Sequence, residues 1–283
     1  METVFYLLIW SLLAGFIGSL IGLGGGIILT PILTIIFNVD IKYAIGSSII
    51  AVIATSSGSA ISYIKEGIAN IKLGLFLEIF TTLGGIIGAL LSGIFSSRIL
   101  YLFFSIILLN SFYGMLKKSG LIRKKSLVIQ DIVEDKYEEK YKFSTSYYDK
   151  AENRVIPYKV TNVKKGSIVM LAAGLASGLL GIGSGAFKVI ALDDYMKLPL
   201  KVSTATSNFM MGVTACSSAL IYFFTGMVNP LIAGPVAIGT LLGSRIGSIV
   251  MQNISSFYIR IIFLPVLFIT IINMLLKGLG VLS

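Results

Sequence analysis

The sequence contains no histidine, one cysteine and few charged residues. Of its 283 residues, 13% are Asp, Glu, Lys or Arg, and Cys216 is the single cysteine. The absence of histidine excludes a His-ligated metal or haem and a Ser–His catalytic triad, and the lone cysteine excludes an internal disulfide framework. Soluble domains carry about a quarter charged residues, so the low charge argues against a soluble protein.

Long apolar runs are the main positive feature. The chain is 55% hydrophobic, its mean hydropathy is +0.92, and runs of about 18 apolar residues, long enough to cross a bilayer, recur along it. This pattern predicts an all-α polytopic membrane protein. We expect about eight transmembrane helices, at residues 4–22, 41–64, 71–95, 98–116, 167–182, 202–225, 231–251 and 257–276. The glycine-rich segments 24–38 and 183–197 are interpreted as broken or re-entrant pieces.

The two halves of the chain align without a gap, residues 9–118 against 168–277. The alignment pairs Gly22 with Gly181, Gly24 with Gly183, Ser48 with Ser207, Thr55 with Thr214, and Asn70 with Asn229. Self-similarity of this kind indicates a duplication. Four crossings in each half predict parallel repeats, with both termini on the same side as the central segment. If the glycine-rich segments crossed fully, the repeats would be inverted.

Basic residues concentrate in the central segment. About half of all Lys and Arg lie between Lys117 and Lys165, which predicts a cytoplasmic location by the positive-inside rule. The segment also holds about half of the acidic residues, so no nucleic-acid partner is expected. Within it, "STSYYDKAENRVIPYKV" alternates aromatic and β-branched residues around "KAEN", which predicts a small cytoplasmic β-ribbon. The expected units are a first transmembrane repeat (1–118), a cytoplasmic loop (119–166) and a second transmembrane repeat (167–283).

Two glycine clusters, "GLGGG" and "GIGSG", interrupt the apolar runs at corresponding positions of the two halves. Non-helical backbone at membrane depth is tolerated where it is buried in protein or lines a wet cavity, and paired breaks of this kind point to a transporter's binding site. Exposed backbone N–H groups there would bind an anion. The candidate substrate-binding residues are Gly22, Gly24, Gly25, Gly26, Gly181, Gly183, Ser184 and Gly185. The alternative is close helix packing on small residues, which we prefer for Gly84, Gly88, Gly243 and Gly247.

Three ionisable residues lie inside apolar runs and differ between the halves. Lys188 aligns with Leu29, Glu78 with Ala237, and Arg245 with Ile86. Ionisable groups within a span are costly and are functional candidates. Lys188, one turn beyond the second glycine cluster, is placed to pair with a bound anion, and Glu78 is a candidate proton carrier. The alternative is a structural ion pair of Glu78 with Lys188 or Arg245, and Arg245 could equally snorkel to the interface.

Hydroxyl and amide groups follow each glycine cluster, near the start of the next span. They could donate to an oxyanion, or bond back to their own helix. These candidates are Ser47 and Ser48 in the first half, and Thr204, Thr206, Ser207 and Asn208 in the second.

Several of these motifs resemble the sulfite exporter TauE/SafE family of bacterial and archaeal membrane permeases. They are "GLGGGIILTP", "GLLGIGSGAFKV", "KVSTATSNFMMGVTA", "LEIFTTLGGIIGA" and "SYYDKAENRVIPYKV". The resemblance covers nearly the whole chain and implies a multi-pass plasma-membrane protein that moves anions such as sulfite or organosulfonates with proton coupling. Two positions depart from the family pattern: Ser184 stands where glycine is usual, and Ile190 where proline is usual. The departures bear on which anion fits.

The leading hypothesis is a secondary anion transporter, an exporter rather than an enzyme, without cofactor or metal. Its partners would be a small anionic substrate and the lipid bilayer, and a homo-oligomer is open. A passive anion channel and a transporter of a non-sulfur organic anion are the alternatives. An intramembrane serine enzyme is disfavoured, because the chain has no histidine to activate Ser184. The last alternative is a membrane scaffold that acts through its central loop.

Overall fold

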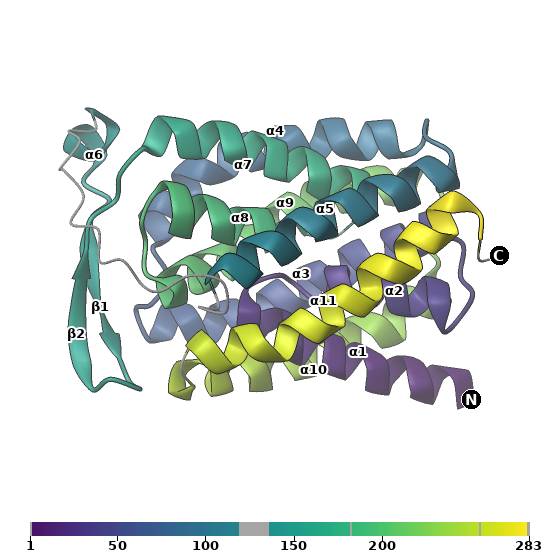
Figure 1. Cartoon of the computed structure of the whole chain (residues 1–283), viewed down its shortest axis with the longest axis horizontal. Helices are drawn as coiled ribbons and strands as arrows, with labels where there is room; N and C mark the ends of the chain where they lie inside the picture. Colours follow the sequence, from purple (N-terminus) through teal and green to yellow (C-terminus); the bar gives the residue numbers. More distant parts are fainter. Residues whose placement is uncertain (1, 119–135, 182, 255, 282–283) are drawn as a thin grey trace.

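The computed structural model describes residues 2–118, 136–181, 183–254 and 256–281, and these form an elongated helical bundle with a β-ribbon at one end (Figure 1). The first half contains α1 (Glu2–Ile21), α2 (Gly26–Ile35), α3 (Ile41–Lys65), α4 (Ile71–Ser92) and α5 (Ser97–Lys118). The central segment contributes α6 (Lys136–Tyr141), β1 (Thr145–Asp149) and β2 (Arg154–Tyr158). The second half contains α7 (Val163–Leu180), α8 (Gly185–Ile190), the π-helix η1 (Ala191–Tyr195), α9 (Leu200–Phe224), α10 (Pro230–Asn253) and α11 (Ser256–Leu279).

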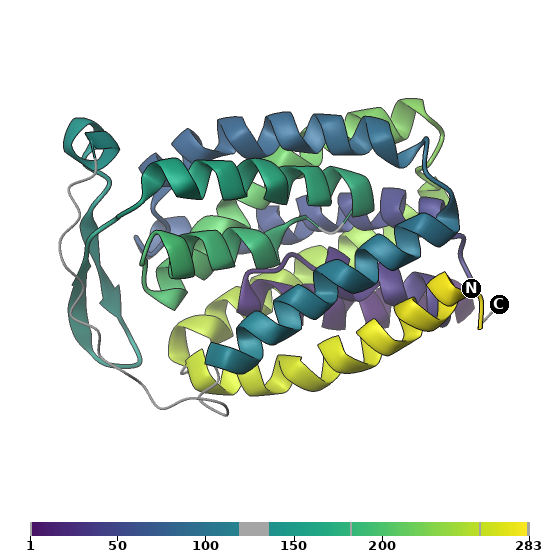
Figure 2. The ribbon, with the colours of Figure 1, turned by 45° about the horizontal axis from the view of Figure 1, so that its top comes forward.

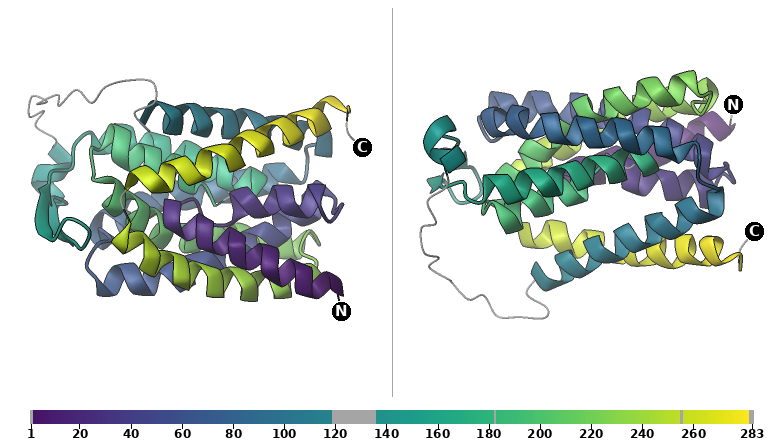
Figure 3. Two further views of the ribbon diagram at one scale, coloured as in Figure 1. Left: turned by 60° about the horizontal axis from the view of Figure 1, so that its bottom comes forward. Right: turned by 90° about the horizontal axis from the view of Figure 1, so that it is seen from above.

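Among the described residues, six helices are long and apolar enough to cross a membrane, namely α1, α3, α4, α7, α9 and α10. Their outer faces carry large apolar side chains. On α4, for example, Ile79 is 60% exposed and Leu90 is 58% exposed. Such faces are stable in lipid and would be a liability in water. The predicted polytopic membrane protein is therefore confirmed at the level of six spans. The remaining long helices, α5 and α11, lie side by side at one edge of the bundle (Figure 3).

Side-chain caps and left-handed glycines set where the long helices begin and end. Asp40, Asn70 and Asn229 accept hydrogen bonds from the first backbone N–H groups of α3, α4 and α10, which satisfies donors that the helix itself leaves unpaired. Gly67 and Gly226 follow α3 and α9 with φ of +65° and +72°. Glycine adopts this conformation without a Cβ clash, so each chain turns back directly into the next helix.

The two chain termini lie at the opposite end of the bundle from the β-ribbon (Figure 1). The prediction that the termini and the central segment share one side is therefore wrong for a bundle that crosses the membrane. The reason lies in α2 and in α8 with η1, which run back toward the end from which α1 and α7 came (Figures 1 and 2). Each half thus makes an odd number of passes, so it begins at one end and finishes at the other.

Helices that correspond to each other in the alignment of the two halves run in opposite directions. The position of a Cβ on Gly46, near the start of α3, would lie 2.1 Å from the carbonyl oxygen of Met227, just beyond the end of α9. At the other end, Ser62 of α3 and Lys201 of α9 both contact Gln252. α3 and α9 are therefore antiparallel, and the preference for parallel repeats was wrong.

Helices from different halves pack on glycine. A Cβ on Gly243 of α10 would lie 2.0 Å from the Leu12 carbonyl oxygen of α1, and one on Gly84 of α4 would lie 2.2 Å from that of Leu171 on α7. No larger side chain fits at these separations. The helix-packing interpretation of these glycines is confirmed, and it joins α1 to α10 and α4 to α7 along their lengths (Figure 2).

The predicted β-ribbon is present, with Lys150 to Asn153 forming its turn. β1 is tied to the bundle by the buried ion pair between Asp149 and Lys201 at the start of α9, whose Oδ1 and Nζ atoms are 2.7 Å apart. Burial tends to raise the pKa of Asp149, but its hydrogen bonds with Lys201 and Tyr147 and the charge of Lys201 outweigh it and hold that pKa below 3.8. The ribbon is therefore fastened to the helices through a carboxylate that stays ionised at neutral pH. Residues 119–135 of the predicted loop lie outside the described residues.

Candidate functional site

The two glycine clusters form tight turns, one between α1 and α2 and one between α7 and α8. Gly22 and Gly24 have φ of +79° and +64°, and the aligned Gly181 and Gly183 have +64° and +73°. These left-handed conformations explain glycine at all four positions. Ser184 also has a positive φ, +53°, although serine has a Cβ, so this residue carries local strain that a glycine would not.

The two turns face each other at the centre of the bundle, as the sequence predicts. A Cβ on Gly185 would lie 2.4 Å from the carbonyl oxygen of Gly22 and 2.5 Å from Cα of Leu23. The Ser207 hydroxyl lies between the turns, 2.9 Å from the Gly22 oxygen and 3.3 Å from the Gly185 oxygen. Backbone from the two halves therefore meets directly, with a hydroxyl of α9 bridging them. The other glycines of the clusters, Gly25 and Gly26, begin α2 and are buried.

Val52 of α3 and Met211 of α9 occupy the crossing between the turns. Both side chains lie against the positions that a Cβ would take on Gly24 and on Gly183. Val52 and Met211 are themselves aligned by the internal duplication, and both are completely buried. The centre of the bundle is consequently closed by one apolar side chain from each half.

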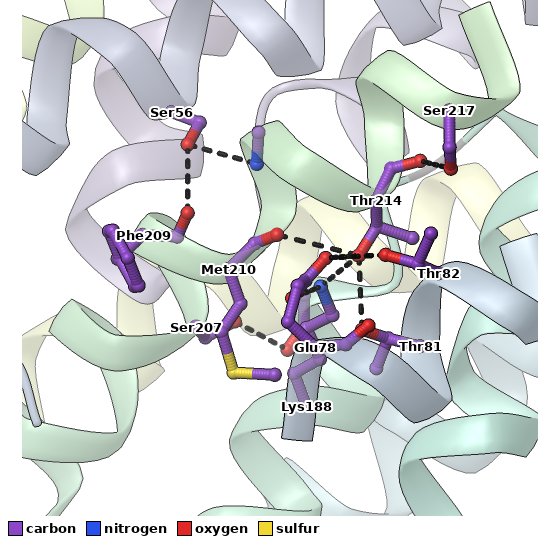
Figure 4. A network of polar contacts seen from close by, with 12 residues as sticks. Ser56, Glu78, Thr81, Thr82, Lys188, Ser207, Phe209, Met210, Thr214 and Ser217 are labelled. Atoms are coloured by element: carbon purple, nitrogen blue, oxygen red, sulfur yellow. Dashed lines mark hydrogen bonds and ion pairs between the residues drawn. The ribbon is translucent and has the colours of Figure 1, made fainter. Parts of the chain in front are cut away.

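Lys188 and Glu78 meet beside the second glycine turn (Figure 4). The Lys188 side chain is fully buried, and its Nζ lies 3.5 Å from Oε2 of Glu78. Nζ also donates to Oγ1 of Thr214 at 2.7 Å, and that hydroxyl in turn donates to Oε1 of Glu78. Thr82 donates to the same carboxylate oxygen at 3.3 Å. The result is a closed network of one cation, one anion and one bridging hydroxyl.

The partner of Glu78 is Lys188, so the suggested pair between Glu78 and Arg245 is wrong. Arg245 is exposed on α10, where its long side chain can reach the interface. Thr214, which bridges the charged pair, is absent from the predicted site residues. The internal alignment pairs Thr214 with Thr55, but that pairing alone does not distinguish Thr214 from the other hydroxyls of α9.

The predicted hydroxyl and amide groups bond mainly across helices and not back to their own helix. Thr206 accepts from the backbone N–H of Asn70 on α4 at 2.9 Å. The Asn208 amide donates to the Ser19 carbonyl of α1 at 3.1 Å, and Thr204 lies 3.4 Å from the Ile21 oxygen. These residues therefore hold the start of α9 against α1 and α4. In the first half, Ser48 accepts from Thr30 of α2 at 2.9 Å.

Several buried polar atoms near the turns have no hydrogen-bond partner among the described residues. They are Oγ of Ser47, Ser177 and Ser184, Oγ1 of Thr55, Oε2 of Glu78 and Oδ1 of Asn208. Buried polar atoms are normally paired, so their concentration around the two turns marks a place that can satisfy a small polar ligand. Within the described ranges, no group of three or more His, Cys, Asp or Glu side chains could hold a metal ion.

Comparisons with known proteins agree on a family. The family model described as Sulfite exporter TauE/SafE matches residues 7–274. The chain is 31% identical to the "Probable membrane transporter protein YunE" of Bacillus subtilis, over 88% of this chain and 89% of that protein. It is 26% identical to the "Probable membrane transporter protein MJ0441" of Methanocaldococcus jannaschii, over 92% and 91%. No solved structure matches the chain.

Proposed function

The chain belongs to the sulfite exporter TauE/SafE family, and from this premise we propose that it moves a small sulfur oxyanion across the plasma membrane by proton-coupled secondary transport. The family and the relatives are membrane transporters and not enzymes, so the chain is a membrane transporter. The substrate, the coupling ion and the direction are the proposed parts. Export is the proposed direction because of the family description.

The observation that carries the proposal is the buried network of Lys188, Thr214 and Glu78 beside the facing glycine turns. Lys188 is neutralised by Glu78 at 3.5 Å. An anion that binds Lys188 would place a second negative charge beside the same lysine in a site of low dielectric, which is costly unless one charge is removed. Protonation of Glu78 removes it. Anion binding and proton uptake are thereby coupled at one site.

The neighbouring groups suit an oxyanion with several acceptor atoms. The Ser184 hydroxyl at the second turn has no partner among the described residues and can donate to an oxyanion, whereas the unused atom of Asn208 is the acceptor Oδ1. Thr214 donates to Glu78, so its hydroxyl becomes available to the anion when Glu78 is protonated. Sulfite and organosulfonates present three oxygens to such donors. We therefore assign the substrate-binding role to the two glycine turns, Lys188 and these side chains, and the proton-carrying role to Glu78. A non-sulfur organic anion is the alternative substrate.

The proposed membrane arrangement follows from the helix directions. α5 and α11, of 22 and 24 residues, would bring the full crossings to four in each half, and the short returning segments α2 and α8–η1 add one further pass to each. The two halves would then be inverted repeats joined by the central segment. Lysines gather at the ribbon end, at Lys65, Lys72, Lys150, Lys159, Lys164 and Lys165. By the positive-inside rule the ribbon is then cytoplasmic and both termini are extracellular. A homo-oligomer stays a prediction.

The test is uptake of labelled anions by proteoliposomes with and without an imposed proton gradient. The set comprises sulfite, thiosulfate, sulfoacetate, sulfate and one carboxylate. Accumulation of a sulfur oxyanion above its equilibrium level, driven by the proton gradient, is the expected result. Flux that only equilibrates would identify a passive channel, and preference for the carboxylate would support the alternative substrate.

A further inference from the structure

A groove between α1, α2 and α11 is not used by the transport site. It encloses a cavity of about 280 Å³ and is lined by Trp10, Leu13, Pro31, Ile32, Ile269 and other apolar side chains. Asn273 is the one amide side chain in the lining. A cavity with such walls does not hold water well. We call it the α1–α2–α11 groove.

The groove lies at the level where aromatic side chains meet the membrane interface. Phe5, Tyr6 and Trp10 follow one another along the start of α1 and are 61%, 55% and 37% exposed. Aromatic side chains favour the headgroup region at the ends of membrane spans. The groove therefore begins near one interface and extends along α1 and α2 into the apolar depth, where lipid tails surround the bundle.

A cation lies beside the Asn273 end of the groove, next to its lining residues. Lys277 lies four residues beyond Asn273 on α11, which is about one helical turn, on the side toward the chain terminus. Its Nζ donates to the Thr34 carbonyl oxygen of α2 at 2.7 Å. An ammonium group carries three donors, so it can bind a phosphate in addition. An apolar groove with a half-buried lysine beside one end matches the two parts of an anionic phospholipid.

We propose that the α1–α2–α11 groove binds one acyl chain of an anionic phospholipid, whose phosphate is held by Lys277. The lipid lies against α2, the half-helix that starts at Gly26 directly after the first glycine turn. The occupant supplies the apolar contacts that α11 does not make there, because α11 packs mainly against α5.

The single tryptophan of the chain, Trp10, lines the groove and reports its occupant. The full chain is placed in nanodiscs of phosphatidylcholine that contain increasing fractions of phosphatidylglycerol with brominated acyl chains, which quench tryptophan fluorescence on contact. The expected result is quenching that saturates at a low fraction of the brominated phosphatidylglycerol. Brominated phosphatidylcholine should quench only in proportion to its fraction.

Two variants and one control decide between a site and ordinary surrounding lipid. Lys277→Ala should raise the half-saturating fraction about fivefold, as expected for one basic side chain at an anionic lipid. Ile32→Phe, which fills the groove, should remove the saturable part. Lys42→Ala, a lysine at the start of α3 and not on one of the three helices that form the groove, should behave as the parent.

Equal quenching by the two brominated lipids, or equal behaviour of the Lys277 and Lys42 variants, would overturn the proposal. The proposal would also be overturned if the protein elutes as a dimer in size exclusion and every brominated lipid quenches Trp10 only weakly. A second copy of the chain would then cover the groove.

Discussion

Replacing Lys188 and Glu78 together should separate the structural cost of the ion pair from its function. The two charges are 3.5 Å apart with side chains 0% and 7% exposed, and they attract each other by about 5 kcal/mol at an effective dielectric constant of about 20. Removing one partner leaves an unpaired buried charge and costs about 3–5 kcal/mol. Lys188→Leu and Glu78→Ala as single changes should therefore lower the free energy of unfolding by about that amount.

The double variant Lys188→Leu/Glu78→Ala introduces the residues that the other half carries at the aligned positions, Leu29 and Ala237. An apolar replacement of both charges is often neutral or stabilising, so its free energy of unfolding should return to within about 1 kcal/mol of the parent. Its transport should nevertheless be absent, because the site has lost both its cation and its proton carrier.

Stability is measured by unfolding in dodecyl sulfate followed by circular dichroism, and transport by uptake into proteoliposomes. Each variant is reconstituted at the same protein-to-lipid ratio, and folded protein is quantified before the flux is compared. A stable double variant that still transports at the parental rate would refute the assignment of Lys188 and Glu78 to the site. A double variant as unstable as the single ones would refute the reasoning on the pair energy.

Three further predictions use other parts of the structure. Gly185→Ala should abolish folding or transport, because its Cβ would lie 2.4 Å from the Gly22 oxygen. The control Gly234→Ala, whose Cβ would meet nothing within 4 Å, should match the parent in fluorescence-detected size exclusion and in uptake. Val52→Ala/Met211→Ala should raise downhill anion leak from loaded vesicles, since the apolar closure between the turns is lost; an unchanged leak would contradict that role. The Asp149–Lys201 pair should fasten the ribbon above pH 3.8 and release it as the pH falls through the lowered pKa of Asp149. The protection factors of the β1 amides, corrected for the intrinsic exchange rate at each pH, should therefore be high at pH 7 and fall only below pH 3.8, and they should be low at every pH in Asp149→Asn. Slow exchange in that variant at pH 7 would contradict the fastening.

Local signals predicted the helices well. The span expected at 41–64 is α3 (Ile41–Lys65), and that expected at 231–251 is α10 (Pro230–Asn253), because each is an apolar run that starts at a capping side chain. The hairpin around "KAEN" was also predicted, since its alternation and turn residues are local. These features depend on a few neighbouring residues, and the sequence displays them directly.

The relative direction of the halves was not predictable in the same way. It depends on whether α2 and α8 turn back after the glycine turns, and that is decided by how they pack against α3 and α9, which the hydropathy pattern does not display. The count of four crossings ignored this return and gave the wrong orientation.

Within the candidate site, Lys188 and Glu78 could be found because charges inside apolar runs are conspicuous. Thr214 could not be singled out, because many hydroxyls lie on α9 and only the fold shows which one faces the pair. The closure by Val52 and Met211 was likewise invisible, since apolar residues in a span look alike until the two turns are placed against them.

The measurement that tests the account most directly compares the parent with Glu78→Gln in proteoliposomes that carry a proton gradient but no anion gradient. The parent should accumulate a labelled sulfur oxyanion in response to the proton gradient. Glu78→Gln, which keeps a hydrogen-bonding side chain but cannot exchange a proton, should exchange the anion without accumulating it. Equal proton-driven accumulation in both proteins would contradict the proposal that anion binding at Lys188 is coupled to protonation of Glu78.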